Sequence, residues 1–248
     1  MLKIIAFILC PFILSGCLAN VNQGNVIRTA SSLVQAASIN DQELSQLSSK
    51  MRASEDRKYR VAPPNSQYTI RLNRIMANLK SVNGIPLTYT VYITNEVNAN
   101  AAADGSVRVY SGIMDRMNDD ELRFVLGHEI GHVADEHTKK KLRTAYTAAA
   151  IRNAAGIYAP VGQLTNSAIG NIAEKFVNAQ YSQAQELDAD AYGIQFMLDN
   201  GYNPNAALTC MAKLQGSGGF FSTHPSSQKR INELQKRINK HMKGTKHN

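Results

Sequence analysis

The chain has 248 residues, of which 44% are hydrophobic and 19% are charged, and its formal net charge at pH 7 is +8. A chain of this length can bury one substantial core, so we expect one folded domain, and no internal repeat is visible. The basic balance suits an anionic membrane surface. Nucleic acid is not expected as a partner, because the sequence contains no nucleic-acid recognition motif.

Residues 1–16 have the pattern of a secretory signal. Their apolar run, Ile4 to Leu14, is shorter than the roughly 20 residues that span a bilayer, so we expect a cleaved segment. The run ends in Leu14-Ser15-Gly16-Cys17, which resembles a lipobox, and cleavage before Cys17 would leave an acylated amino terminus in a membrane. By resemblance to bacterial lipoproteins, Leu18 favours the outer membrane, facing the periplasm. The alternative is an ordinary signal with a chance Cys.

Small and polar residues at 17–40 predict a lipidated tether, and residues 41–248 are expected to form the folded domain. Cys10 would leave with the signal and Cys17 would carry lipid, so Cys210 is the remaining thiol of the mature chain. One thiol cannot form an internal disulfide. We therefore expect Cys210 to be a buried apolar side chain on a helix.

The first part of the domain combines helices and strands. A polar helix is expected at about 41–59, on the surface of the domain. A second helix follows Pro63-Pro64, because apolar residues recur there with helical spacing at Leu72, Ile75, Met76 and Leu79. Alternating side chains predict a strand at 87–93 with one buried face, and another strand is expected at 106–110.

A helix of about 118–137 carries the sequence His128-Glu129-Ile130-Gly131-His132, and Asn118 with Glu121 can form a capping box at its start. Residues four apart lie on one helix face, so His128 and His132 can reach a single metal ion. Glu129 lies on the apolar stripe, where a carboxylate is costly unless a metal site compensates it. The pattern therefore predicts a zinc peptidase; the alternatives are a chance match or surface histidines.

A catalytic zinc ion needs a third protein ligand. His137 is the nearest histidine, but its spacing from His128 would put it on the far side of the same helix, where it would be a structural or surface residue. Glu186, on a second helix of about 181–200, is the better candidate. Asp190 shares a face with Glu186 and would accept the free N–H of a ligand imidazole. The alternative is an acidic, solvated helix face.

Glycines on both helices predict that they approach closely. Gly127 and Gly131 flank His128 on the side away from Glu129, and Gly193 lies on the face of Glu186. Each glycine inside a helix costs roughly 1 kcal/mol relative to Ala, which is understandable if a larger residue would separate the helices.

The remaining segments are expected to surround this site. The Ala- and Gly-rich stretch 144–173 predicts packed or lid-like helices, and Asn203-Pro204 a helix start. A glycine-rich segment, 216–225, carries His224, which would either donate to the oxyanion of the reaction or occupy the open metal position; a loop histidine without metal contact is the alternative. The final helix is amphipathic, with apolar residues at Ile231, Leu234 and Ile238.

Three ordered motifs, His-Glu-Ile-Gly-His at 128–132, Glu-Leu-Asp-Ala-Asp at 186–190 and Thr-His-Pro at 223–225, resemble the gluzincin metallopeptidases of the HtpX and CAAX-prenyl-protease group, including its small outer-membrane lipoproteins. The resemblance implies an α+β, mostly helical zincin domain with a small β-sheet. It also implies zinc ligands at His128, His132 and Glu186, a general base at Glu129, and supporting roles for Asp190 and His224.

The expected function is that of a membrane-anchored zinc endopeptidase with one Zn²⁺ per chain, in which Glu129 takes the proton from a zinc-activated water. By the same resemblance, its substrates would be misfolded or stalled cell-envelope proteins, and other partners would be outer-membrane lipid, assembly factors or proteases. An edge strand within 95–110 would dock the substrate. The alternative is a latent or chaperone-like assembly lipoprotein whose zinc is sealed by His224.

Overall fold

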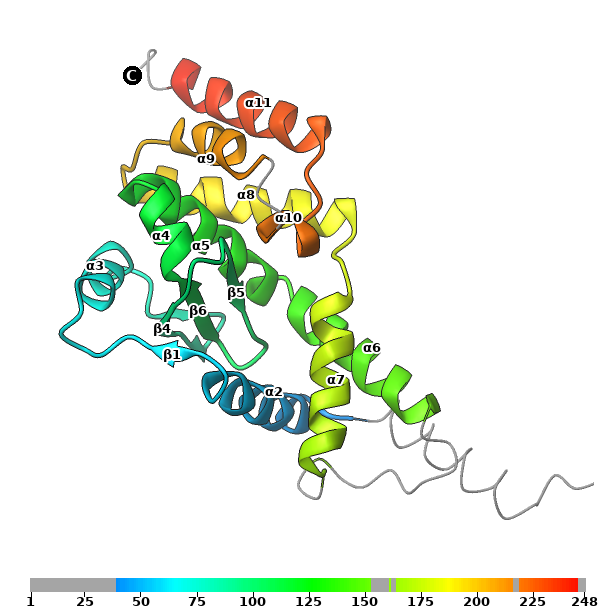
Figure 1. The fold of residues 1–248 in the computed structure, drawn as a ribbon. Coiled ribbons are helices and arrows are strands. Elements are labelled where there is room, and N and C mark those ends of the chain that lie inside the picture. Colours follow the sequence, from blue (N-terminus) through cyan, green and yellow to red (C-terminus); the bar gives the residue numbers. More distant parts are fainter. Residues whose placement is uncertain (1–38, 153–160, 162–163, 216–218, 245–248) are drawn as a thin grey trace, which may run out of the picture.

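A computed structural model describes residues 39–152, 161, 164–215 and 219–244 (Figure 1). The predicted signal, Cys17 and nearly all of the tether lie outside these residues. In chain order, the elements are α2 Asp41–Asp56, β1 Arg60–Val61, α3 Gln67–Ile75, β2 Ser81–Val82, β3 Ile85–Pro86, β4 Thr88–Ile93, β5 Ala99–Ala101, β6 Ser106–Tyr110, α4 Ser111–Arg116, α5 Asp119–Ala134, α6 His137–Arg152, α7 Asn166–Asn178, α8 Gln183–Asp199, α9 Ala206–Leu214, α10 Phe220–Thr223 and α11 Gln228–Gly244. The predicted α+β, mostly helical class is confirmed.

The main sheet is small and mixed, with the strand order β1-β4-β6-β5. Strands β4 and β6 are parallel, with Val91 opposite Val109, whereas β1 and β5 run antiparallel to their neighbours. Strand β5 is an outer strand of this sheet and falls within the segment 95–110 where an edge strand is predicted. Its position matters because β5 packs beside α5.

Helices α5 and α8 lie side by side at the centre of the fold (Figure 1). Both begin with a capping box: Asn118 with Glu121 on α5, as predicted, and Ser182 with Gln185 on α8. A Cβ atom at Gly131 would lie 2.9 Å from the Cβ of Tyr192 and 3.0 Å from a backbone Cα of α8. The close approach predicted from the glycines is therefore confirmed.

We expect Gly131→Ala to destabilise the protein. The added methyl group has to displace the backbone of α8, which costs about 1–3 kcal/mol, and the better helix propensity of Ala returns up to about 1 kcal/mol of this. Gly170→Ala on α7 is the matched control, because nothing lies within 4 Å of a Cβ there, and it should stabilise slightly. Thermal unfolding of both variants measures the difference. Equal stabilisation by both would contradict the tight contact.

Helices α2, α6 and α7 form a second apolar cluster beside the central core (Figure 1). The expectation of a polar surface helix at 41–59 is wrong in part, because Leu44 and Leu47 of α2 are fully buried in this cluster. Two leucines three residues apart were too few to reveal the buried face. Helices α6 and α7 pack against each other, which confirms packed helices at either end of the stretch 144–173; its centre lies outside the described residues.

The structure also tests the expectations for Cys210 and for the start of the helix that carries it. Cys210 is fully buried on α9, as predicted. The start of that helix was placed too early, since Asn205 is its N-cap and Asn203-Pro204 forms the preceding turn. In the part of the chain that the structure describes, no helix combines the length and apolar character that crossing a membrane requires.

Candidate metal centre

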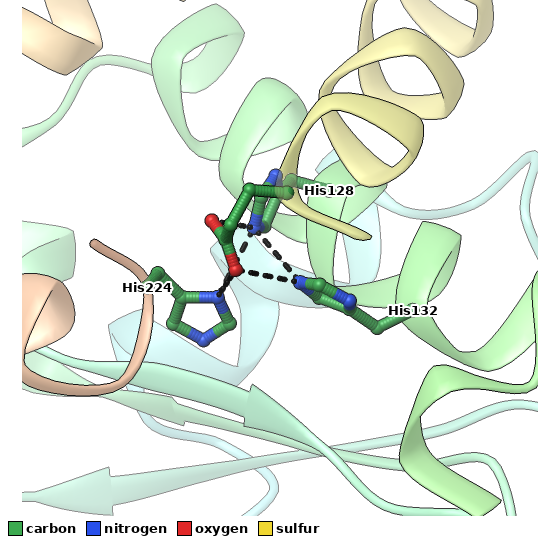
Figure 2. Close-up of side chains that lie close together, drawn as sticks. His128, His132 and His224 are labelled. Carbon is green, nitrogen blue, oxygen red and sulfur yellow. Dashed lines mark hydrogen bonds and ion pairs between the residues drawn. The ribbon is translucent and has the colours of Figure 1, made fainter. Parts of the chain in front are cut away.

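Four side chains meet between α5, α8 and the segment after α10. His128 and His132 come from α5, Glu186 from α8 and His224 from the end of α10; one potential ligand atom from each lies within 4.8 Å of the others. All four are buried. Figure 2 shows the three histidines converging on one point, two from α5 and His224 from the segment after α10. The Nε2 atom of His128 is 3.2 Å from Nε2 of His132 and 3.2 Å from Nδ1 of His224.

The carboxylate of Glu186 lies within this ring of nitrogens. Its Oε1 is 3.4 Å from Nε2 of His132 and 3.2 Å from Nδ1 of His224, and its Oε2 is 3.6 Å from Nε2 of His128. Burial alone would raise the pKa of Glu186, but its hydrogen bonds with His132 and His224 and the nearby imidazoles lower it well below the ordinary value. Glu186 is therefore ionised at neutral pH, as a metal ligand must be.

Two buried oxygen atoms at this point make no hydrogen bond within the described residues: Oε1 of Glu129 and Oε2 of Glu186. Arg230 compensates the charge of Glu186 from one side. Carboxylate oxygens that accept no hydrogen bond in a dry interior are still costly, and a metal cation among them would reduce that cost. Imidazole nitrogens with one carboxylate are also the donor set that zinc takes in catalytic sites. The residues present therefore fit a zinc ion.

The protonation of the two helix histidines differs. Burial lowers the pKa of His132 well below its ordinary value, so its imidazole is neutral, which is the form that binds a metal. Burial has the same effect on His128, but the hydrogen bond with Asp190 and the charge of Glu186 outweigh it and raise the pKa. Protons compete with a metal for His128, so metal affinity should fall as the solution becomes acidic.

Glu129 lies beside the cluster and is 1% exposed. Its Oε2 accepts a hydrogen bond from the backbone N–H of Ala101 in β5 at 3.2 Å. Its Oε1 is 3.2 Å from Nε2 of His224, at ion-pair distance but without hydrogen-bond geometry. One oxygen is thus fixed to the edge strand and the other faces the cluster.

Asp190 lies behind His128, on the side away from the cluster. Its Oδ1 is 2.8 Å from Nδ1 of His128, which orients the ring so that Nε2 faces the other ligands. Burial would raise the pKa of Asp190, but the guanidinium of Arg230 and the contact with His128 hold it below the ordinary value. The structure therefore brings Asp190 to the place where the sequence predicted it.

Arg230 was not found from the sequence, yet it is 1% exposed and contacts three parts of the site. Its Nε and Nη2 each donate to Asp190 at 2.7 Å. Its Nη1 is 2.6 Å from Oε2 of Glu186, at an angle outside hydrogen-bond geometry, and donates to the backbone oxygen of His224 at 3.3 Å. A signal was present: Arg230 precedes Leu234 and Ile238 at four-residue spacing, on the apolar face of α11.

The expectation that His137 lies on the far side of the metal helix is wrong. Helix α5 ends at Ala134, and Glu136 adopts a left-handed backbone conformation with φ = 57°. The chain turns there, so His137 begins α6, is buried, and has its Nδ1 atom 3.1 Å from Nδ1 of His132. The four clustered side chains do not include His137, which packs behind His132.

A cleft of about 490 Å³ leads to this cluster between α2, β5, α6 and α7. Glu129 and His224 line its inner end, together with Tyr181, whose ring stacks on His132 with centroids 3.7 Å apart. Asn100 of the edge strand and Tyr59 also line the cleft. An extended chain in the cleft would therefore run between the edge strand and the helical layer and pass Glu129.

An H-E-x-x-H helix, a glutamate from a second helix and a buried glutamate beside them, on an α+β fold, define a zinc metallopeptidase. The sequence profile of Peptidase family M48 matches residues 66–238, and the chain belongs to this family, whose members use zinc. It is 39% identical to Metalloprotease LoiP and 35% identical to Metalloprotease YcaL, both of Escherichia coli strain K12; each comparison covers 91% of this chain and 92% of the relative.

More distant relatives are similar over a smaller part of their own length. The beta-barrel assembly-enhancing protease of Yersinia pestis is 27% identical over 77% of this chain and 42% of the relative. A protease HtpX homolog of Trichormus variabilis is 25% identical over 72% of this chain and 77% of the relative, in agreement with the group that the three motifs resembled. The match at 66–238 falls within the predicted domain 41–248. The limits 1–16, 17–40 and 41–248 themselves stay predictions.

Proposed function

We propose that this metallopeptidase is anchored in the bacterial outer membrane, faces the periplasm, and hydrolyses peptide bonds of misfolded or stalled cell-envelope proteins. The observation that carries the catalytic part is the position of Glu129, with one oxygen bonded to an edge strand and the other facing four potential metal ligands. A purely structural zinc site would have no use for such a carboxylate.

In this proposal His128, His132 and Glu186 hold the zinc ion, and Asp190 fixes the orientation of His128. When bound, the zinc would supply Lewis acidity toward the scissile carbonyl and would lower the pKa of water. Oε1 of Glu129 then accepts the proton of the attacking water and returns it to the leaving amine. The hydrogen bond from Ala101 keeps the carboxylate in place during both transfers.

Substrate would bind as an extended chain along β5. Pairing with an edge strand uses main-chain hydrogen bonds, which give affinity with little sequence preference. Such binding requires an unfolded segment, and this is why misfolded or stalled proteins are the proposed substrates. The name of the beta-barrel assembly-enhancing relative supports clients or partners among β-barrel proteins.

A latent form is the second candidate, and the position of His224 favours it. Nδ1 of His224 is 3.2 Å from both Nε2 of His128 and Oε1 of Glu186, so this imidazole shares the cluster with the proposed ligands. A fourth protein ligand would close the position at which substrate has to bind. The segment after α10 would then have to move before hydrolysis. If it did not move, the protein would bind its clients without cutting them, as a chaperone does.

Digestion of casein by the full-length protein in detergent tests the function. We expect cleavage and about one zinc per chain; 1,10-phenanthroline should abolish cleavage, and added zinc should restore it. Zinc without cleavage in the wild type, together with cleavage by His224→Ala, would establish the latent form. Zinc-loaded wild type and His224→Ala that both leave casein intact would contradict the peptidase assignment.

Anchoring through Cys17 is tested separately. Cys17→Ala removes the acyl attachment point, and a chain without acyl groups has no stable membrane anchor. We expect the wild type in the outer-membrane fraction of a bacterial cell and the variant in the soluble or unprocessed pool. Cys210→Ala is the matched control and should stay in the membrane fraction. Outer-membrane recovery of the Cys17 variant would remove lipidation from the proposal.

A further inference from the structure

A lysine lies in the wall of the cleft and has no role in the chemistry described above. Lys141 of α6 lines the same cleft as Glu129 and His224. Its Nζ atom is 4.3 Å from the ring centroid of Tyr181 and 4.7 Å from that of Phe176. The ammonium group is therefore held against two aromatic rings a short distance from the candidate metal centre.

The rings position this ammonium group but leave its N–H donors unused. Among the residues that the structure describes, no oxygen accepts a hydrogen bond from Lys141 and no carboxylate lies within ion-pair distance. Lys139, on the same helix, shows the contrast, since it pairs with Asp41 at 2.8 Å and Glu136 at 3.0 Å. Cation–π contacts attract a charge but do not replace its hydrogen bonds. Lys141 is thus ready to bind an acceptor that enters the cleft.

Two other charged groups of the cleft are already engaged. Glu129, the nearest carboxylate of α5 in the cleft, contacts Ala101 and His224. Arg52 of α2 lines the cleft too, but it donates to Ser106 and pairs with Glu55. Lys58 lines the cleft as well, but its side chain is exposed. Lys141 is partly buried, and a ligand can approach it without breaking an ion pair at the metal centre.

The protonation of Lys141 depends on its burial and on the charged groups around the cleft. Burial lowers the pKa of Lys141 to about 8, and the negative charges of Glu129 and Glu186 oppose this shift. Glu174 of α7 and Tyr181 line the same cleft. At pH 7 the amine is mostly protonated. Because it is poorly hydrated, a hydrogen bond with an ionised partner there is stronger than one at the surface.

We propose that Lys141 is a specificity-determining residue that binds a carboxylate of the substrate in the cleft, either an Asp or Glu side chain or the carboxyl terminus of the cleaved chain. This inference rests on the proposed peptidase function and deepens it. The edge strand supplies affinity for any extended backbone, and Lys141 adds a preference for acidic segments.

Paired fluorogenic peptides, built around a site that the wild-type full-length protein cleaves in casein, test this. Each pair differs by Glu against Gln, or Asp against Asn, at one position near the scissile bond, and a further pair has a free against an amidated carboxyl terminus. For wild type, we expect kcat/KM to favour the charged member by about tenfold, the size of one charge-assisted hydrogen bond. The pair that shows the preference identifies the side chain or the terminus as the source.

Lys141→Met keeps the length of the side chain and its packing between the rings, and it should remove the preference while leaving the uncharged peptides within about twofold. Lys141→Arg should retain most of the preference for the charged peptides. Lys140→Met, at the exposed neighbouring position, is the control and should behave as the wild type. An unchanged preference in Lys141→Met, with normal thermal unfolding, would overturn the proposal.

Failure of the proposed function would be recognised separately. If the wild type cleaves no casein, fluorescent pairs of an unstructured casein segment with the same Glu/Gln, Asp/Asn and free/amidated differences are used instead, and their binding to wild type and Lys141→Met is measured by anisotropy. Tighter binding of the charged peptides by wild type alone would support Lys141 as a carboxylate site in a protein that does not cut. Equal binding by both proteins would remove that site as well.

Discussion

Replacement of Glu129 by Gln is expected to lower kcat for peptide hydrolysis by about 10²–10⁴-fold, the usual contribution of a general base. The amide has the shape of the carboxylate, and its oxygen can still accept the hydrogen bond from Ala101. It cannot accept the proton of a water molecule at the position that Oε1 now occupies. Casein digestion and peptide turnover, measured on samples of equal zinc content, detect the loss.

The same substitution should leave the metal and the fold in place. Glu129 is not among the four clustered side chains, so about one zinc per chain should remain. Stability should be unchanged or slightly higher, because the variant no longer buries a carboxylate oxygen that lacks a hydrogen bond. Glu136→Gln, an exposed glutamate seven positions along, is the control and should keep full activity. Comparable turnover by the Glu129 variant would assign the base to another residue.

Local patterns were sufficient to predict the parts of this site that lie on one helix or on one face. The capping box of Asn118 and the four-residue spacing of His128 and His132 depend on geometry within α5. The glycines of α5 and α8 allowed one long-range inference, because a residue without a side chain inside a helix indicates a close neighbour. Because the expected neighbour of α5 was α8, Glu186 of α8 could be placed beside α5.

The features that the sequence did not reveal depend on where the chain turns and on contacts between segments that are distant in the sequence. The left-handed residue Glu136 is neither Gly nor Asn, so nothing in the sequence marked the end of α5, and His137 was assigned to the wrong side. The burial of α2 depends on α6 and α7, which contact it only in the folded structure. The spacing of Arg230 with Leu234 and Ile238 indicated that Arg230 faces the core, but its partners on α8 could be known only from the folded structure.

Arg230→Met is expected to have the largest effect on the folded protein. Arg230 makes two 2.7 Å hydrogen bonds to Asp190 and lies 2.6 Å from Glu186, and all three side chains are buried. Removal of one member of such a group leaves buried charges without compensation, which typically costs about 3–5 kcal/mol. Urea unfolding of the zinc-free protein measures this loss directly, because no metal then compensates Glu186.

Zinc binding provides a second readout for the same residue. Without Arg230, Asp190 loses the partner that fixes it, and the orientation of His128 is less restricted; loss of such supporting contacts typically lowers metal affinity about 10–100-fold. Arg230→Lys keeps the charge but cannot make the paired contact with Asp190. The stability and zinc affinity of this variant should therefore lie between those of Arg230→Met and of the wild type. Arg237→Met, exposed on the same helix, should change neither property. Wild-type stability and zinc affinity in Arg230→Met would mean that the buried carboxylates are compensated by another group.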